Sequence, residues 1–317
     1  MIHWSLGNRH VMESLEFQQV PELRDPTLIM AFGGWPDAGE GATQAVKYLV
    51  QKLRATKFAE IEPEEFYDFT QTRPNIFLVE TGVRQVQWPT NTFHYWQNPE
   101  GERDLLLFSG VEPNLRWRTY AGLVIDVMER CSCRSILHLG ALLDAVPHTR
   151  ETRLTGSSNN PDWRRILDRV RAPASRYEGP TGITSAIMES CNRKDFLYTS
   201  VWGHAPHYLQ ATPNYKVSHA LLRVVGSLLR VPLNLQEMRR KVAAFEREVE
   251  KVVSQDAQIQ AYAKRLEEHY DRIFYPSEGG DIPTPEEVLD EVEEFLKGEQ
   301  RRRGGDGEGE WDGSPEP

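Results

Sequence analysis

The sequence predicts an α/β protein in which a mostly parallel sheet is flanked by helices and followed by a C-terminal helical, coiled-coil-like extension. Two observations lead to this expectation. Short apolar runs alternate with segments of helical period over residues 1–232, and this alternation is typical of a parallel sheet covered on both faces. From Leu235 onward a single apolar stripe then repeats in steps of three and four residues, which is typical of a coiled-coil helix.

Six apolar runs have the length and composition of buried strands. They are Leu28–Phe32, Phe58–Ile61, Asn75–Glu80, Asp104–Phe108, Ser135–Leu139 and Phe196–Val201. Thr92–Trp96 is rich in aromatic residues and is expected to form an edge strand or a hairpin. Helical period marks the intervening segments Ala42–Leu53, Leu115–Arg130, Pro161–Val170, Ile183–Ser190 and Asn214–Leu229.

The apolar stripe predicts one long helix from Leu235 to Ile273. Its members include Leu235, Met238, Val242, Phe245, Val249, Val252, Ile259 and Leu266, and Asp256 is the one polar residue at a stripe position. A helix with one apolar stripe must pack against the body, a second helix or another copy of the chain. Pro283–Lys297 offers a second helix, because Val288, Leu289, Val292, Phe295 and Leu296 recur at helical spacing. We therefore expect an α/β domain over residues 1–232, a helical hairpin over 233–298 and a disordered acidic tail over 299–317.

The net charge of −10 belongs to the C-terminal segment alone. From Pro276 onward four basic residues face fourteen acidic ones (4 − 14 = −10), so the rest of the chain is neutral. A neutral body has no field that attracts nucleic acid or an anionic membrane. No apolar run approaches the ~20 residues that span a bilayer, and the N-terminus shows no secretory signal. A cytoplasmic protein without nucleic-acid or membrane partners is expected.

The stretch TLIMAFGGWPDAGEGA at 27–42 has the strand, glycine-rich turn and helix start of a nucleotide site. Gly39 and Gly41 fit the dinucleotide fingerprint, but Gln44 stands at its third glycine position. No Lys-Ser/Thr pair follows, so there is no P-loop. Nucleotide binding is the minor alternative, and we expect the glycines to form a tight crossover in which Asp37 caps the next helix.

Other catalytic or metal signatures are incomplete. His204 and His207 could chelate a metal, but Pro206 favours a loop and no third ligand is evident. The chain has no G-x-S-x-G elbow and no paired carboxylates. A metal site and a serine triad remain alternatives. The main expectation is that the protein has no catalytic residues, no metal and no cofactor.

Six blocks in fixed order carry a resemblance to a known family. They are GGWPDAGEGA, FYDFTQTRPNI (66–76), SGVEPNLRW (109–117), LGALLDAVPHTR (139–150), YEGPTGI (177–183) and SVWGHAPHYLQATPN (200–214). Together they resemble the bacterial branch of the proteasome assembly chaperone 2 family. The resemblance implies a phosphorylase/hydrolase-like α/β fold without an established catalytic activity. Eukaryotic and archaeal relatives bind proteasome α subunits, many through a C-terminal hydrophobic-Tyr-any tail, which residues 313–317 do not contain.

The resemblance also singles out residues that could line one cleft at the strand ends. The candidate cleft residues are Trp35, Asp37, Arg73, Glu112, His148, Arg150, His204, His207 and Tyr208. Two functions follow. The first is a non-enzymatic, assembly-chaperone-like protein that binds a partner or itself, as a homo-oligomer, through the Leu235–Ile273 stripe. The alternative is an enzyme or small-ligand binder, similar to nucleoside phosphorylases, that uses the strand-end cleft.

Overall fold

The computed structural model describes residues 14–79, 82–101, 103–209, 211–231 and 233–274. Its main sheet has eight strands in the order β1-β3-β6-β7-β2-β8-β10-β9. The strands are β1 (Leu15–Phe17), β2 (Thr27–Gly33), β3 (Thr56–Ile61), β6 (Thr92–Trp96), β7 (Leu105–Val111), β8 (Ser135–Asp144), β9 (Leu154–Ser158) and β10 (Leu197–Pro206). The four central strands β7, β2, β8 and β10 are parallel, and the outer strands pair antiparallel. The expected α/β class is confirmed.

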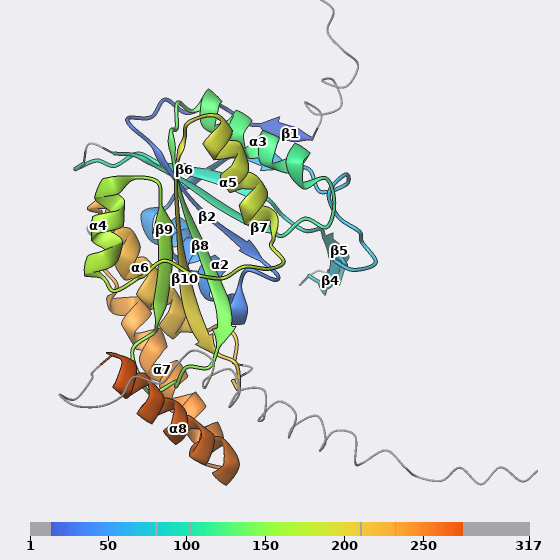
Figure 1. Cartoon of the computed structure of the whole chain (residues 1–317). Helices are drawn as coiled ribbons and strands as arrows, with labels where there is room; N and C mark the ends of the chain where they lie inside the picture. The colour runs from blue at the N-terminus through green and yellow to red at the C-terminus, as the bar shows by residue number, and fades with distance from the viewer. Residues whose placement is uncertain (1–13, 80–81, 102, 210, 232, 275–317) are drawn as a thin grey trace, which may run out of the picture.

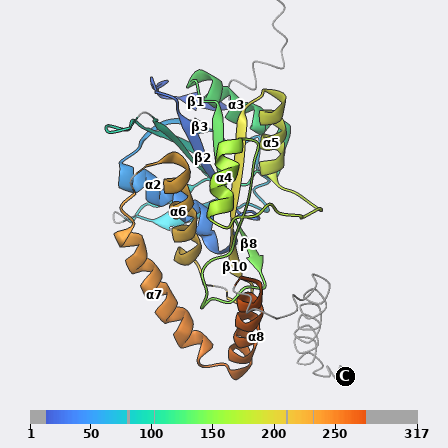
Figure 2. The same ribbon diagram turned by 60° about the vertical axis from the view of Figure 1, so that its left-hand side comes forward.

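Helices cover both faces of this sheet (Figures 1 and 2). They are α2 (Gly41–Leu53), α3 (Trp117–Arg130), α4 (Pro161–Arg169), α5 (Ile183–Arg193) and α6 (Tyr215–Leu229). The side chains of α3 and α5 form one core cluster with the sheet, and those of α2, α4 and α6 form the other. Because the central strands are covered on both sides, they are almost continuously apolar and buried.

Three strand predictions need correction. The run Asn75–Glu80 is not a buried strand: β4 (Asn75–Leu78) pairs only with β5 (Arg84–Gln87), in a separate hairpin whose eight strand residues are all exposed. Of the two alternatives for Thr92–Trp96, the edge strand is wrong, because β6 lies between β3 and β7, whereas the hairpin is confirmed, because β6 pairs antiparallel with β7, the next strand along the chain. The last parallel strand extends to Pro206, so His204 lies in β10 rather than in a loop.

The single helix predicted from Leu235 to Ile273 is also wrong. The chain forms α7 (Gln236–Val253) and α8 (Ala257–Phe274), which diverge after a short turn. Asp256 causes the break, since its carboxylate accepts hydrogen bonds from the backbone N–H groups of Gln258 and Ile259 at 2.8 and 3.2 Å. It therefore acts as the N-cap of a new helix. No helix among the described residues is both long and apolar enough to cross a bilayer.

Four of the eight apolar stripe residues named above are buried against this same chain, and three more are partly buried. Met238 belongs to the core on the α2–α6 side of the sheet. Phe245, Val249 and Val253 form a smaller cluster with Leu209, Ala211, Tyr215 and Ile259. On α8, Leu266 is buried, whereas on α7 Val252 is 59% exposed. The second helix expected over Pro283–Lys297 and the acidic tail lie outside the described residues.

Candidate functional site

The opening turn after β2 is a structural crossover. The carboxylate of Asp37 is buried and accepts hydrogen bonds from the backbone N–H groups of Ala42 and Thr43, at 2.7 and 3.3 Å, and from the Thr43 hydroxyl. Burial raises the pKa of Asp37, whereas these hydrogen bonds lower it, and the net shift is upward. Asp37 therefore caps α2, as expected. Gly39 has a positive φ of 60° and its carbonyl accepts the N–H of Asn214 at 2.7 Å, which docks the turn on the start of α6.

We expect Asp37→Ala to lower the free energy of unfolding by about 1–2 kcal/mol, because it leaves the first N–H groups of α2 without their acceptor. Denaturant unfolding checks this value. Glu40→Ala in the same turn is the control, since the Glu40 side chain is exposed, and it should change stability by less than about 0.5 kcal/mol. Equal effects of the two substitutions would contradict the capping role.

Trp35 and Glu112 lie together at the ends of β2 and β7. The Glu112 carboxylate accepts the backbone N–H of Ile183 at 3.0 Å, which is the first residue of α5. Burial raises the pKa of Glu112, partly offset by backbone hydrogen bonds. A side chain at Gly182 would collide with this carboxylate and reach the ring of Trp35. Trp35 is nonetheless 62% exposed. Arg73 is also exposed and has no ion pair among the described residues, so it does not join this pair.

A second group surrounds the loop between β8 and β9. His204 Nδ1 lies 2.7 Å from the carboxylate of Asp144, and its Nε2 lies 3.0 Å from the hydroxyl of Thr155. Burial opposes ionisation of Asp144, but the hydrogen bond and charge of His204, together with Arg153, outweigh it and hold the pKa of Asp144 below its usual value. The ring Nδ1 of His207 lies 3.1 Å from the Asp144 carbonyl. Asp144 thus fixes both histidines.

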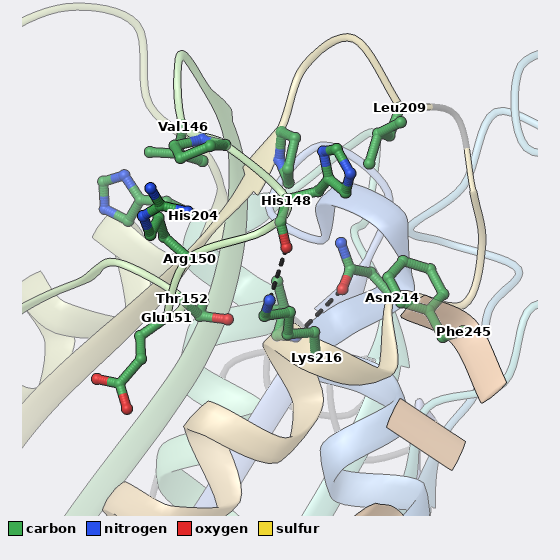
Figure 3. Close-up of a pocket in the computed structure, with 13 residues that line it drawn as sticks. Val146, His148, Arg150, Glu151, Thr152, His204, Leu209, Asn214, Lys216 and Phe245 are labelled. Atoms are coloured by element: carbon green, nitrogen blue, oxygen red, sulfur yellow. Dashed lines mark hydrogen bonds between the residues drawn. The ribbon is translucent and has the colours of Figure 1, made fainter. Parts of the chain in front are cut away.

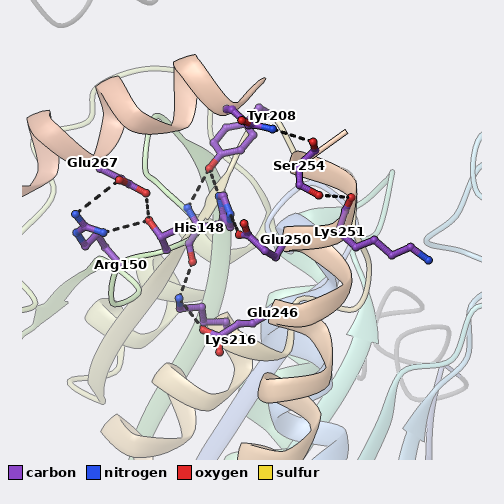
Figure 4. Close-up of polar contacts among 11 residues, drawn as sticks. His148, Arg150, Tyr208, Lys216, Glu246, Glu250, Lys251, Ser254 and Glu267 are labelled. Carbon is purple, nitrogen blue, oxygen red and sulfur yellow. Dashed lines mark hydrogen bonds and ion pairs between the residues drawn. The ribbon is translucent and has the colours of Figure 1, made fainter. Parts of the chain in front are cut away.

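Charged side chains of α6 and α7 contact this loop (Figure 4). Lys216 donates to the carbonyl of His148 at 2.6 Å and pairs with Glu246 at 2.9 Å. His148 Nδ1 lies 2.6 Å from the Tyr208 hydroxyl, and its Nε2 lies 3.6 Å from Glu250. Burial lowers the pKa of His148, although Glu250 acts in the opposite direction. The loop is therefore fixed from both the α6 and the α7 side.

The helix α8 closes over the same loop. Arg150 makes a two-pronged pair with Asp271, at 2.8 and 2.7 Å. The Tyr270 hydroxyl donates to the carbonyl of Glu151 at 3.0 Å, and the Tyr262 ring packs edge-on against His207 at 5.6 Å between centroids. Arg150 is thus paired with an acid that comes from the C-terminal extension.

The space left inside this group is very small (Figure 3). A cavity lined by His148, Arg150, His204, Lys216 and Phe245 has a volume of about 10 Å³. That volume holds about one water molecule, whereas small-molecule sites usually measure ~300–1,000 Å³. The polar side chains at these strand ends are therefore used to join loops and helices.

A hydrogen-bonded series runs from Thr155 through His204 to Asp144. This is the order of a nucleophile, a base and an orienting carboxylate. Thr155 and His204 are each only 6% exposed, and Thr155 does not line the cavity described above. A nucleophile needs a place for the reacting atom about 3 Å away, and this cavity provides none beside the hydroxyl. No group of three or more His, Cys, Asp or Glu side chains within the described ranges could hold a metal ion.

The structure brings together five of the nine candidate cleft residues. His148, Arg150, His204, His207 and Tyr208 surround one loop, while Trp35, Asp37 and Glu112 lie at the ends of β2 and β7 and Arg73 stands apart. Sequence reasoning missed the residues that hold the loop: Lys216, Glu246, Glu250, Tyr262 and Asp271. Nothing in their spacing links them to the loop, because Lys216 lies in α6 and the other four meet the loop only after α7 and α8 fold back.

Comparison with known proteins identifies the family of this chain. The family model described as the PAC2 family matches residues 31–253. This chain belongs to the PAC2 family. A PAC2 family protein from Streptomyces avermitilis is 33% identical, with 75% of this chain and 99% of that chain covered and a TM-score of 0.68. No curated protein matches the sequence.

Two further solved structures are similar to this PAC2 family protein. A proteasome-assembly chaperone homologue from Mycobacterium tuberculosis is 34% identical, with 74% of this chain and 99% of that chain covered and a TM-score of 0.67. PbaB from Pyrococcus furiosus, an archaeal proteasome activator, is 20% identical, with 75% and 97% covered and a TM-score of 0.61. The latter likeness concerns the fold alone.

Proposed function

We propose that this PAC2 family protein is a non-enzymatic, chaperone-like protein that acts by binding another protein. The observation that carries the proposal is a contrast between two surfaces. The polar strand-end residues are paired with one another around a cavity of about 10 Å³. The β4–β5 hairpin, by comparison, exposes large apolar side chains: Ile76 is 63% exposed and Leu78 is 72% exposed. Exposed apolar patches of this kind mark protein contacts.

The Mycobacterium tuberculosis relative supports the same direction, since it is described as a proteasome-assembly chaperone homologue. The fold does not favour self-association through the Leu235–Ile273 stripe. Met238, Phe245, Val249 and Leu266 are buried against their own chain, so they are not available to a second copy unless α7 and α8 detach. The hairpin therefore replaces the stripe as the proposed contact surface.

Affinity capture from native lysate tests this function. We expect the wild-type chain to recover a protein partner that Ile76→Ser/Leu78→Ser recovers at least tenfold less well. Leu197→Ser is the matched control, because Leu197 is also an exposed leucine but lies at the start of β10, at the opposite end of the strands. Equal recovery by all three proteins would contradict a hairpin contact.

The small-ligand alternative has its own measurement. A ligand that binds only the folded state raises the melting temperature. Since the proposed function includes no small-molecule site, thermal-shift screening against nucleosides, phosphate and divalent metals should give no shift. A shift of several degrees with any of them would favour the alternative function at the strand ends.

A further inference from the structure

The helix α8 lies outside the two core clusters that cover the sheet. None of its buried side chains that the structure describes belongs to either cluster: Tyr262, Ala263, Leu266 and Tyr270. The helix diverges from α7 after the turn at Asp256 and lies across the ends of β8 and β10 (Figure 2). Elements at the edge of a fold open locally at a lower free energy than its core. We therefore expect α8 to detach while the sheet and its covering helices stay folded.

One side of α8 carries the groups that contact the body. Tyr262, Leu266 and Tyr270 recur every four residues, so they share one face of the helix. Glu267 and Asp271 each follow a member of this row by one residue and form its polar edge. The three basic residues of the helix are instead exposed: Lys264, Arg265 and Arg272. The contacting side of α8 is thus an apolar row with two acids.

Arg150 is the centre of the surface that receives these acids. Its guanidinium pairs with Asp271 at 2.8 and 2.7 Å and lies 3.8 Å from the Glu267 carboxylate (Figure 4). Within the described ranges, both acids that pair with Arg150 come from α8. The Thr149 hydroxyl also donates a hydrogen bond to Glu267. Detachment of α8 therefore leaves a guanidinium and a hydroxyl on the loop without their carboxylate acceptors.

The residues after β10 supply the aromatic part of the same surface. The ring of Tyr262 packs edge-on against the rings of His207 and Tyr208, at 5.6 and 5.7 Å between centroids. The hydroxyl of Tyr270 donates to the carbonyl of Glu151 at 3.0 Å. The surface is therefore complementary to tyrosine as well as to acid, and all of these groups come from one side of a single helix.

The position of Asp271 indicates that the acids serve this contact and not the helix itself. Asp271 lies in the last turn of α8, where the helix macrodipole disfavours a negative charge. Its side chain is 41% exposed, and salt weakens ion pairs that solvent reaches. The contact between α8 and the loop is therefore specific in its pattern of groups but readily reversed.

We propose that Thr149, Arg150, His207 and Tyr208 form a docking site for a helix of a partner protein, and that α8 occupies this site as an intramolecular ligand. The partner helix presents two acids one turn apart beside a row of tyrosine and leucine, because this is the chemistry that the site contacts in α8. The inference goes beyond the proposed function, since the site lies on the loop after β8 and the end of β10 and not on the β4–β5 hairpin.

Hydrogen exchange of the purified full-length chain tests whether α8 is released. We expect amides of α8 to exchange about tenfold faster in Glu267→Gln/Asp271→Asn than in wild type, while those of α6 stay unchanged. Glu248→Gln/Glu268→Gln is the matched control, because it removes the same charge from two exposed acids that make no ion pair in the described part of the chain. The control should exchange as wild type does.

A peptide of residues 257–274 tests the docking site itself. A crosslink between its exposed positions 260 and 264 holds the peptide helical, since a free helix of this length is marginal in water. Measured by fluorescence anisotropy, it should bind the Glu267→Gln/Asp271→Asn chain about tenfold more tightly than wild type, in which α8 occupies the site. Arg150→Gln in that chain should weaken binding about tenfold, and so should Glu267→Gln/Asp271→Asn in the peptide.

Three results would overturn the proposal. Equal exchange of α8 in wild type and in Glu267→Gln/Asp271→Asn would show that the two acids do not hold the helix. Failure of the crosslinked peptide to bind the Glu267→Gln/Asp271→Asn chain would show that the surface is not a docking site. Binding that Arg150→Gln leaves unchanged would place the peptide elsewhere on the molecule.

Discussion

Replacement of the buried His138 by methionine should remove a large part of the acid sensitivity of this protein. His138 lies within β8, is fully buried, and neither ring nitrogen has a hydrogen-bond partner among the described residues. The rings of Tyr198 and Trp202 pack against it. Burial lowers the pKa of His138 to about 3, from an ordinary value of 6.5. The folded state therefore keeps this ring neutral where the unfolded chain protonates it.

The sign of the effect follows from this difference. Between pH 6.5 and about 3 the unfolded state binds one more proton than the folded state at His138, so the free energy of unfolding falls as the pH falls. The expected slope is ~1.4 kcal/mol per pH unit for this one site. His94, His148 and His219 add to it, because burial lowers the pKa of each.

Urea unfolding of wild type and His138→Met between pH 7.5 and pH 4 measures this contribution. At pH 7.5 the two proteins should differ by less than about 1.5 kcal/mol, since methionine fills a similar volume without polar atoms. At pH 4.5 the variant should be more stable by roughly 2–3 kcal/mol. Parallel loss of stability in both proteins would show that His138 does not titrate as its burial implies.

Removal of the Phe245 ring should detach the C-terminal helices from the body. Phe245 anchors the smaller apolar cluster between α7 and the segment around Leu209 and Tyr215. A buried phenylalanine replaced by alanine typically costs 3–5 kcal/mol, and because this cluster is small we expect a loss of about 3 kcal/mol. Amides of α7 and α8 should exchange much faster in Phe245→Ala.

Val252→Ala is the matched control for this substitution. Val252 lies on the same predicted stripe but is 59% exposed, so its truncation should change stability by less than about 0.5 kcal/mol. Light scattering of both variants adds a second readout. If Phe245→Ala were as mild as Val252→Ala, or if it reduced the molar mass without loosening α7 and α8, the stripe would serve an interface between copies.

The parallel centre of the fold was predictable because burial on both faces leaves a direct trace in composition. Leu28–Phe32 is a continuous apolar run and Ser135–Leu139 is apolar except for Ser135 and His138, and both form central strands. Asn75–Glu80 has a similar composition, yet β4 is exposed. Residue type alone does not distinguish a strand covered by helices from one whose apolar side faces outward, because that outcome depends on where the chain goes next.

The break between α7 and α8 did have a signal. Asp256 was the one polar residue on the stripe, and it caps α8. The pairing of Arg150 with Asp271 had none, because 121 residues separate them. Charged residues on an exposed helix usually face solvent, so only the folded arrangement shows that α8 holds the loop after β8.

The most direct test of protein contact through the apolar hairpin uses a partner that affinity capture has recovered. Calorimetry then measures the Kd of this partner for the wild-type chain and for its variants. Ile76→Ser/Leu78→Ser should raise Kd at least tenfold, which corresponds to about 1.4 kcal/mol. Glu112→Gln, which alters the strand-end group while keeping its size, should change Kd less than about twofold, within the small effects typical of residues outside a contact centre. A Kd that is unchanged by the hairpin substitutions but sensitive to Glu112→Gln would contradict the proposed contact surface and place recognition at the strand ends.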